Sequence, residues 1–285
     1  MSNTQDPARP PLRDIIRAFD LGAKRRFGQH FLFDSNLTRK IVRAAGDLDK
    51  SSVIEIGPGP GGLTRALLDA HAKRVVAIEL DPRCIAALGG LVAESQGRLT
   101  IIEGDALAIS LEKVAPSPRR IVANLPYNIA TPLLLQWLAA AEHFEEMVLM
   151  FQKEVADRLC AKPGSKAYGR LSIVAQWRMD ITPLFDIGPK AFVPPPKIAS
   201  TVLRLRTRAE PIAAAEGAID IATLGRVTKA AFGQRRKMLR TSLKTLGVEI
   251  STLLEETGVS PTARAEELRV EDFCALARAL AKRAA

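Results

Sequence analysis

The run Asn-Leu-Pro-Tyr carries the most specific chemistry in the sequence. It follows the apolar stretch Ile121–Ala123, so we expect it at the carboxyl end of a buried strand. The Asn124 Oδ1 atom and the Leu125 carbonyl can accept hydrogen bonds from the two N–H groups of an amino group on an aromatic ring. These hydrogen bonds localise the nitrogen lone pair for attack. Pro126 keeps Leu125 extended, and Tyr127 can stack on the ring. A polar turn that closes a strand is the alternative interpretation.

A glycine-rich turn, Gly-Pro-Gly-Pro-Gly-Gly, covers residues 57–62 after a second apolar stretch. Gly57, Gly59 and Gly62 match the G-x-G-x-x-G pattern, in which the backbone approaches a ligand closely. The pattern alone is compatible with NAD, a flavin or S-adenosylmethionine. Because its two prolines have no N–H, the turn has few donors for a pyrophosphate. A ligand without phosphates therefore fits better.

Three acidic residues stand at the ends of predicted strands: Glu55, Glu79 and Asp105. Parallel strands end at the same edge of a sheet, so we expect the three carboxylates to face one pocket. Glu79 lies about 20 residues after the first glycine, where an acid accepts ribose hydroxyls, and Asp105 offers an acceptor for an adenine amino group. Together they suit a cofactor with a positive sulfonium and repel a diphosphate. Each acid alone is equally compatible with a surface carboxylate.

Short apolar runs that alternate with helical patterns must position these residues. Strands are predicted at Val53–Ile56, Arg74–Ile78, Leu99–Glu103, Arg120–Ala123, Met147–Phe151, Ile181–Ile187 and Ser200–Leu205. Helices are predicted at Leu63–Ala70, Cys84–Ala93, Pro132–Ala141 and Gln152–Leu159. The alternation is typical of an α/β fold with a doubly wound, mainly parallel sheet. After Arg208 the chain is Ala-rich and helical, which indicates a smaller second domain.

Composition narrows the class of protein. The chain has 285 residues, with 41 basic and 31 acidic residues and a net charge of +10, which favours a polyanionic partner. Its three cysteines form no C-x-x-C pair and its three histidines have no metal-ligand spacing, so we expect neither a disulfide framework nor a metal site. No apolar stretch is long enough to cross a membrane and residues 1–11 do not resemble a signal peptide, so we expect a cytoplasmic protein.

The order of motifs along nearly the whole chain resembles the ribosomal RNA adenine N6,N6-dimethyltransferases. The matching segments are residues 26–32 (RFGQHFL), 55–59 (EIGPG), 78–81 (IELD), 104–106 (GDA), 124–128 (NLPYN), 192–197 (FVPPPK) and 232–237 (FGQRRK). The resemblance implies a seven-stranded, Rossmann-like sheet with a small all-helical C-terminal domain. It also implies that S-adenosylmethionine (SAM) donates methyl groups to two adjacent adenines near the 3′ end of small-subunit rRNA during assembly of that subunit.

The resemblance assigns roles to individual residues. It implies that Asn124, Leu125, Pro126 and Tyr127 hold the target adenine, with Phe192 as a second aromatic face; a buried Phe at a domain junction is the alternative. The implied cofactor-binding residues are Gln29, His30, Leu32, Glu55, Gly57, Gly59, Glu79, Leu80, Asp105, Ala106 and Asn124. Many relatives have Asn at the position of His30, so its contact with the cofactor involves either the imidazole or only the backbone.

Seven basic residues and no acid lie between Arg226 and Lys244: Arg226, Lys229, Arg235, Arg236, Lys237, Arg240 and Lys244. At helical spacing most of them form one stripe, which we interpret as a tract for RNA phosphates; a solvated face is the alternative. We predict a basic N-terminal arm at 1–25, a methyltransferase domain at 26–207 and a helical RNA-binding domain at 208–285.

Three other functions stay open. The first is a related methyltransferase of the antibiotic-resistance type that acts on large-subunit rRNA, which the segments 27–32 and 194–197 disfavour. The second is a non-enzymatic nucleic-acid binder or assembly factor, which the intact Asn124–Tyr127 run and the three acids disfavour. An NAD-dependent dehydrogenase is the third, and no candidate partner for hydride transfer accompanies the glycine turn. We expect a monomer that requires no metal.

Overall fold

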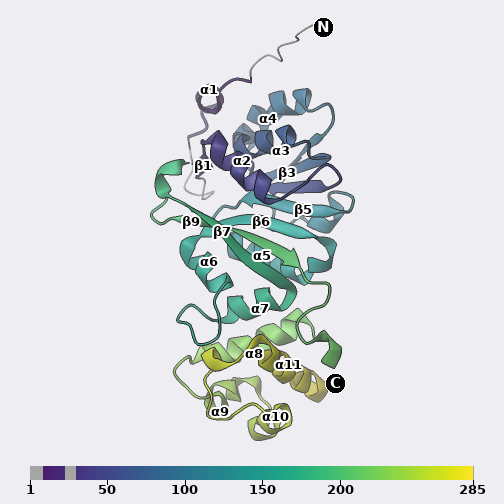
Figure 1. Cartoon of the computed structure of the whole chain (residues 1–285), viewed down its shortest axis with the longest axis vertical. Helices are drawn as coiled ribbons and strands as arrows, with labels where there is room; N and C mark the ends of the chain where they lie inside the picture. The colour runs from purple at the N-terminus through teal and green to yellow at the C-terminus, as the bar shows by residue number, and fades with distance from the viewer. Residues whose placement is uncertain (1–8, 23–29, 285) are drawn as a thin grey trace. The chain divides into compact units, whose positions relative to one another are not determined.

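The computed structural model describes residues 9–22 and 30–284, and its central feature is a seven-stranded sheet. The strand order is β4-β3-β2-β5-β6-β9-β7. The bounds are β2 Ser52–Ile56, β3 Arg74–Glu79, β4 Leu99–Glu103, β5 Arg119–Asn124, β6 Glu146–Gln152, β7 Met179–Ile187 and β9 Ser200–Thr207. Each predicted strand is present within a few residues of its predicted limits, which confirms the predicted fold class. Figure 1 shows the strands with helices packed beside them.

Parallel pairing brings the ends of five strands to one edge of the sheet. Strand β2 pairs in parallel with β3 and with β5, β3 with β4, and β5 with β6. The interior residues of β2 and β3 are buried on both faces, which is why these strands are almost wholly aliphatic in sequence. Glu79 ends β3 and Asn124 ends β5, so both lie at the carboxyl edge, where doubly wound sheets bind ligands.

Helices connect the strands. Their bounds are α1 Leu12–Ala18, α2 Ser35–Ala44, α3 Gly62–Asp69, α4 Pro82–Glu94, α5 Ala130–Ala139, α6 Lys153–Leu159, α7 Arg170–Arg178, α8 Ile221–Gly233, α9 Leu239–Ser242, α10 Ile250–Thr257 and α11 Val270–Ala284. The Asp34 carboxylate caps α2 by accepting the Asn36 N–H at 2.8 Å, and Asp81 caps α4 with Pro82 in its first turn. None of the helices in the described ranges is long and apolar enough to span a membrane.

The described part of the N-terminal arm contacts helices α3 and α4, although none of the residues of α1 is buried. Ile15 and Ile16 of α1 contact a small apolar cluster that includes Cys84 of α4. Arg9 donates to the carboxylates of Asp69 and Glu94 at 2.6 and 2.8 Å. These contacts attach residues 9–18 to helices α3 and α4.

Contacts divide the chain into two compact units. The first comprises Met1–Gln136, Glu142–Gln152 and Leu184–Arg204, and it contains strands β2 to β6. The second comprises Trp137–Ala141, Lys153–Pro183 and Leu205–Ala285. In the second unit, Tyr168 and Trp177 share a buried core with Leu224 of α8 and Phe273 of α11. Helices α6 and α7 therefore pack with the C-terminal helices.

Candidate active site

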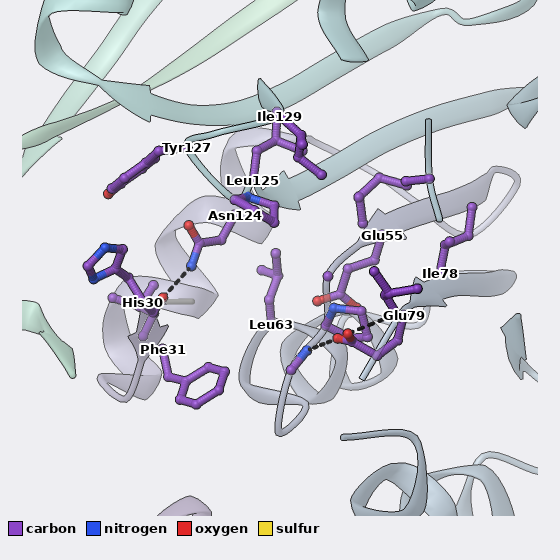
Figure 2. A pocket seen from close by; sticks show the side chains of 18 of the residues that line it. His30, Phe31, Glu55, Leu63, Ile78, Glu79, Asn124, Leu125, Tyr127 and Ile129 are labelled. Carbon is purple, nitrogen blue, oxygen red and sulfur yellow. Dashed lines mark hydrogen bonds between the residues drawn. The ribbon is translucent and has the colours of Figure 1, made fainter. Parts of the chain in front are cut away.

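A pocket opens at the carboxyl edge of the sheet, inside the first unit. It is lined by the ends of β2, β3 and β5, by the glycine turn and by segments 30–32 and 104–107. The sequence-predicted residues in its wall are His30, Leu32, Glu55, Gly57, Gly59, Glu79, Leu80, Asp105, Ala106, Asn124, Leu125, Pro126 and Tyr127. Residues far apart in sequence are thus brought together as predicted from the strand ends. Figure 2 shows the pocket from close by.

The glycine turn uses its own N–H groups within the chain. Gly57 donates to the Ile78 carbonyl at 2.9 Å, Gly59 to Glu79 Oε2 at 3.0 Å, and Gly61 to the Pro58 carbonyl at 3.0 Å. The two intervening prolines have no N–H. A pyrophosphate needs several such donors. The turn is therefore unsuited to a dinucleotide and suited to a ligand without phosphates.

Two of these glycines are required by geometry. Gly59 has φ +55°, and a Cβ atom there would lie 2.8 Å from Phe31 Cε1. Gly61 has φ +89° and caps α3; its Cβ would lie 2.8 Å from the side chains of Leu88 and Leu91. Any side chain at either position would be strained and would collide with its neighbours. Glycine at these two positions therefore lets the turn lie close to β1 (Phe31–Leu32) and α4.

The Glu79 carboxylate organises the turn from the end of β3. Besides Gly59 N–H on Oε2, its Oε1 accepts the N–H groups of Leu80 and Asp81, both at 2.8 Å. A carboxylate has about four acceptor positions, so about one is left for a ligand hydroxyl. Burial raises the pKa of Glu79, and the three backbone donors oppose that shift. Glu79 therefore has a structural role beside the predicted contact with ribose.

The Glu55 carboxyl is more deeply buried and has fewer donors. Its residue is 2% exposed, and its Oε2 accepts the Thr64 hydroxyl of α3 at 2.7 Å. Burial raises the pKa of Glu55 to about 8, and the neighbouring Glu79 charge adds to the shift while the Thr64 hydroxyl opposes it. Thr64 was not predicted from the sequence. The only sequence signal for its role is its position in the first turn of the helix that follows the glycine turn.

The outer wall of the pocket is more exposed. Asp105 is exposed, and its Oδ1 accepts the Leu107 N–H at 2.9 Å, while Ala106 is buried beside it. Leu80 is 47% exposed, so its side chain presents apolar surface at the rim. A flat apolar group such as a purine would contact this wall, with Asp105 at its edge as a hydrogen-bond acceptor.

The orientation of the Asn124 amide is fixed by a backbone group. Asn124 Nδ2 donates to the His30 carbonyl at 3.1 Å. Because a carbonyl oxygen only accepts hydrogen bonds, the nitrogen must face His30 and Oδ1 must lie at the opposite end of the amide. Figure 2 shows that oxygen turned toward Tyr127. The Oδ1 acceptor predicted from the sequence therefore lies at the end of the amide away from His30.

His30 joins three segments of the site. Strand β1, Phe31–Leu32, pairs antiparallel with β8, Phe192–Val193, and this places His30 beside Pro194. His30 Nδ1 lies 2.7 Å from the Pro194 carbonyl, and its ring packs on that of Tyr127 with centroids 5.3 Å apart. The Tyr127 hydroxyl in turn lies 2.5 Å from Ser200 Oγ. Burial raises the pKa of Tyr127, so the phenol stays neutral.

Phe192 occupies a different place from the pocket residues. Its side chain is 1% exposed and lies in the apolar core of the first unit, with Leu32 as its cross-strand partner. The side chain exposed on this strand is that of Val193. The structure thus does not bring Phe192, which the resemblance assigned as a second aromatic face, to the pocket wall, and its burial is that of a core residue.

Leu125 is buried, and Pro126 packs close to the glycine turn, since a Cβ on Gly57 would lie 3.5 Å from Pro126 Cγ. The Pro126 carbonyl accepts the first N–H groups of α5. Gln29 lies outside the described residues.

Within the part of the chain that the structure describes, no cluster of three His, Cys, Asp or Glu side chains is arranged to hold a metal ion.

The basic residues of the second unit do not lie on one helix. Helix α8 ends at Gly233, and Gln234 leaves the helical conformation with φ −131° and ψ 69°. Two of the seven are on α8, three are in the following turn, and Arg240 and Lys244 are on α9 and the 3₁₀ turn after it. The expected single helical stripe is wrong, because a glycine and an extended residue interrupt it. All seven are nevertheless exposed.

Arg235 differs from the other six. Its Nε donates to Glu266 at 2.7 Å, and its Nη2 donates to the Lys166 carbonyl at 2.8 Å. In the described residues, none of the others is within ion-pair distance of an acidic side chain. Arg235 therefore fixes the turn, and the remaining charges are available to an anion.

Comparisons with known proteins agree with this geometry. A family model described as ribosomal RNA adenine dimethylase matches residues 21–282. Proteins named ribosomal RNA small subunit methyltransferase A from Rhodospirillum rubrum and Paramagnetospirillum magneticum are 58% and 60% identical; the matches cover 95% of this chain and 92% and 95% of theirs.

Solved structures give the same result for the fold. A dimethyladenosine transferase from Plasmodium falciparum has a TM-score of 0.74 at 26% identity, over 90% of this chain and 98% of that one. The 23S rRNA methyltransferase ErmE has a TM-score of 0.66 at 26% identity, over 88% and 99%.

Proposed function

The chain belongs to the ribosomal RNA adenine dimethylase family, and we propose that it converts two adjacent adenines near the 3′ end of small-subunit (16S) rRNA to N6,N6-dimethyladenines. It is a SAM-dependent rRNA adenine dimethyltransferase. The observation that carries the proposed attack by an adenine amino group is the fixed Asn124 amide, with its Oδ1 in the pocket wall beside Tyr127.

The pocket residues fit SAM. The cofactor supplies a methyl group on a positively charged sulphur. Glu79 has about one acceptor position left for a ribose hydroxyl, and Asp105 is placed at the rim for the adenine amino group. The glycine turn offers no cluster of donors to a phosphate, and the carboxyl groups favour a cation. We propose that the cofactor site is formed by Gln29, His30, Leu32, Glu55, Gly57, Gly59, Glu79, Leu80, Asp105, Ala106 and Asn124.

The target amine is held by Asn124 and Leu125. An adenine amino group is a weak nucleophile because its lone pair is delocalised into the ring. Hydrogen bonds from its two N–H groups to Asn124 Oδ1 and the Leu125 carbonyl reduce the delocalisation of the lone pair into the ring, which makes it available to the methyl group. Bound SAM would supply the methyl group for the new N–C bond, and the proton that the amine loses would leave to water. Positioning supplies most of the acceleration.

Two aromatic residues are candidates for stacking on the target base. Tyr127 lies in the pocket wall, and the contacts to His30 and Ser200 hold its ring. Phe192 would have to leave the core to reach a base, so its proposed stacking role requires a rearrangement of strand β8.

RNA is held by charge on the second unit. We propose that Arg226, Lys229, Arg236, Lys237, Arg240 and Lys244 contact phosphates, and that Arg235 adds its charge while it holds the turn. We propose the domain limits 1–25, 26–207 and 208–285 for the arm, the methyltransferase domain and the RNA-binding domain. The protein acts as a monomer in the cytoplasm on an assembling small subunit.

One experiment tests the substrate. The protein is incubated with radiolabelled SAM and, separately, with undermethylated small subunits, naked 16S rRNA, large subunits and DNA. Label is expected in small-subunit rRNA as N6,N6-dimethyladenine, found by nuclease digestion and chromatography. Labelling of large subunits alone would instead identify the activity of the ErmE-like relatives. No label in any substrate, with SAM bound normally, would contradict the proposed reaction.

A further inference from the structure

The two carboxyl groups at the base of the pocket differ in their hydrogen-bond donors. Glu79 accepts three backbone N–H groups, which stabilise its ionised form. Glu55 is 2% exposed, and its donor is the single Thr64 hydroxyl. A buried carboxylate is poorly stabilised when it has one neutral donor and a second carboxylate nearby. A neutral carboxyl group has neither the desolvation cost of a buried charge nor the repulsion from the second carboxylate.

We propose that Glu55 is a specificity-determining residue that is neutral in the cofactor-free pocket and ionises when the sulfonium of SAM enters. The proton passes from the Glu55 carboxyl to solvent, and the resulting carboxylate balances the added positive charge. After methyl transfer the cofactor sulphur is an uncharged thioether, so the carboxylate loses its counter-charge and takes up a proton. The inference rests on SAM as the methyl donor.

The other ionisable groups in the wall have different surroundings. The Glu79 carboxylate, at the end of β3, is stabilised by three backbone N–H donors, and Asp105 is exposed to water. His30 is hydrogen-bonded to the Pro194 carbonyl, and the phenol of Tyr127 is tied to Ser200. From α3, the group that contacts Glu55 is the Thr64 hydroxyl, which does not titrate. The most deeply buried acid is therefore the one that gains most from a new cation.

The physical consequence is a pocket that distinguishes cofactor from product by charge. The raised pKa of Glu55, about 8, means that the group is about nine-tenths protonated at pH 7. Binding of SAM must then release close to one proton, and its affinity must fall about tenfold for each pH unit below 7. S-adenosylhomocysteine, which carries the same amino acid and adenosine groups but no sulfonium, should release fewer protons and show a shallower dependence.

Isothermal titration calorimetry tests this directly. SAM and S-adenosylhomocysteine are titrated into the full chain at pH 6.5, 7.0, 7.5 and 8.5, in pairs of buffers with different ionisation enthalpies. The α-amino group of both ligands titrates in the same range, so the measured quantity is the proton release of wild type minus that of Glu55→Gln. Glu103→Gln, an exposed acid at the end of β4 outside the pocket wall, is the matched control.

We expect about 0.9 proton more from wild type than from Glu55→Gln with SAM at pH 7, and clearly less with S-adenosylhomocysteine. Glu103→Gln should behave as wild type. Equal release by wild type and Glu55→Gln, or by SAM and S-adenosylhomocysteine, would overturn the inference. If SAM does not bind wild type at all, the assignment of the cofactor fails instead, which is a distinct result.

A second variant covers the case in which Glu55→Gln does not fold. Thr64→Val keeps the volume of the buried side chain and removes the hydroxyl donor to Glu55. The pKa of Glu55 should rise further, so proton release on SAM binding should persist to a higher pH than in wild type. An unchanged release profile in Thr64→Val would also overturn the inference.

Discussion

Asn124 donates its side-chain N–H to the backbone carbonyl of His30, 94 residues earlier in the sequence, at 3.1 Å. The donor therefore belongs to the end of β5, where we propose that the target base is held, and the acceptor belongs to the segment that leads into β1. Because the carbonyl can only accept, the contact decides which end of the amide is presented to the pocket. Orientation of the proposed acceptor thus depends on the backbone of His30 and not on its side chain.

The first prediction concerns this amide. Asn124→Asp replaces the N–H donor with a carboxylate oxygen that faces the His30 carbonyl, and Asn124→Ala removes both ends of the amide. Both variants should lower the rate of methyl transfer by at least about a hundredfold, since a positioned acceptor for developing charge is worth that much. Single-turnover assays with labelled SAM measure it. Asn36→Ala, an exposed asparagine on α2, is the control and should retain the wild-type rate.

Near-normal turnover in Asn124→Ala would contradict the role of the acceptor. A large loss of thermal stability in Asn124→Ala, with no loss of rate per folded molecule, would indicate instead that the residue only terminates the strand.

The second prediction concerns Glu79. Glu79→Ala removes the acceptor for three backbone N–H groups as well as the ribose contact, so SAM affinity should fall by about ten- to a hundredfold and the thermal midpoint should fall too. Calorimetry and thermal unfolding measure the two effects. Asp105→Asn removes a charge from the same pocket but from an exposed position, and it should lower affinity with little loss of stability. Unchanged SAM affinity in Glu79→Ala would exclude its contact with the cofactor.

The third prediction is a pH dependence of folding. The pKa of Glu55 is about 8 in the folded chain against 4.5 as its ordinary value, so the folded state binds more protons than the unfolded state between these limits. The resulting stability is fully present below pH 4.5 and is lost as the pH rises through 8. The free energy of unfolding of cofactor-free wild type, relative to Glu55→Gln, should therefore decrease between pH 5.5 and 8.5, by up to about 1.4 kcal/mol per pH unit.

Urea denaturation at four pH values measures this difference. The shift of Glu79 has the same direction, but it is present in both proteins and largely cancels. Parallel curves for wild type and Glu55→Gln would show that Glu55 is ionised in the folded chain at neutral pH.

The fourth prediction separates the basic residues. Replacing Arg236, Lys237 and Arg240 with Gln should weaken binding to small subunits and lower the salt slope by about 0.7 to 0.9 for each lost phosphate contact. SAM affinity should not change. Filter binding across a salt series measures the slope, and a variant with Lys50, Lys73 and Lys113 changed to Gln matches the lost charge on the first unit.

Arg235→Gln should behave differently from Arg236→Gln. Because Arg235 is bound to Glu266 and to the Lys166 carbonyl, its loss should reduce stability by about 1 kcal/mol, whereas loss of Arg236 should affect RNA binding alone. If the two variants have the same stability, the contacts of Arg235 do not hold the turn. If the triple variant binds as wild type does, the phosphate tract lies elsewhere.

The sequence predicted the sheet and the pocket edge well, because both follow from periodicity and strand ends. Runs such as Val75–Ile78 are aliphatic since they are buried on both faces, and parallel pairing then fixes where Glu79 and Asn124 must lie. Side-chain direction was harder to predict. Phe192 turns into the core because strand β8 pairs with β1, and no local pattern reveals that long-range register.

The end of helix α8 and the hydrogen-bond partners of Glu79 could not be predicted from the sequence either. In the sequence, the helical spacing of the basic residues continues past Gly233. In the structure, the backbone leaves the helical conformation at Gln234. Likewise, a carboxylate at the end of a strand gives no sign that it will accept the Gly59 N–H, because that contact depends on how the turn folds back.

The internal hydrogen bonds of the glycine turn have a kinetic consequence. Since Gly57, Gly59 and Gly61 already donate within the chain, the turn has its final shape before a ligand arrives. The entropy of ordering this loop is lost during folding, so little of it remains to be lost on association. The encounter with the cofactor then needs no slow rearrangement of the turn, and the observed association rate should rise linearly with ligand concentration without reaching a plateau.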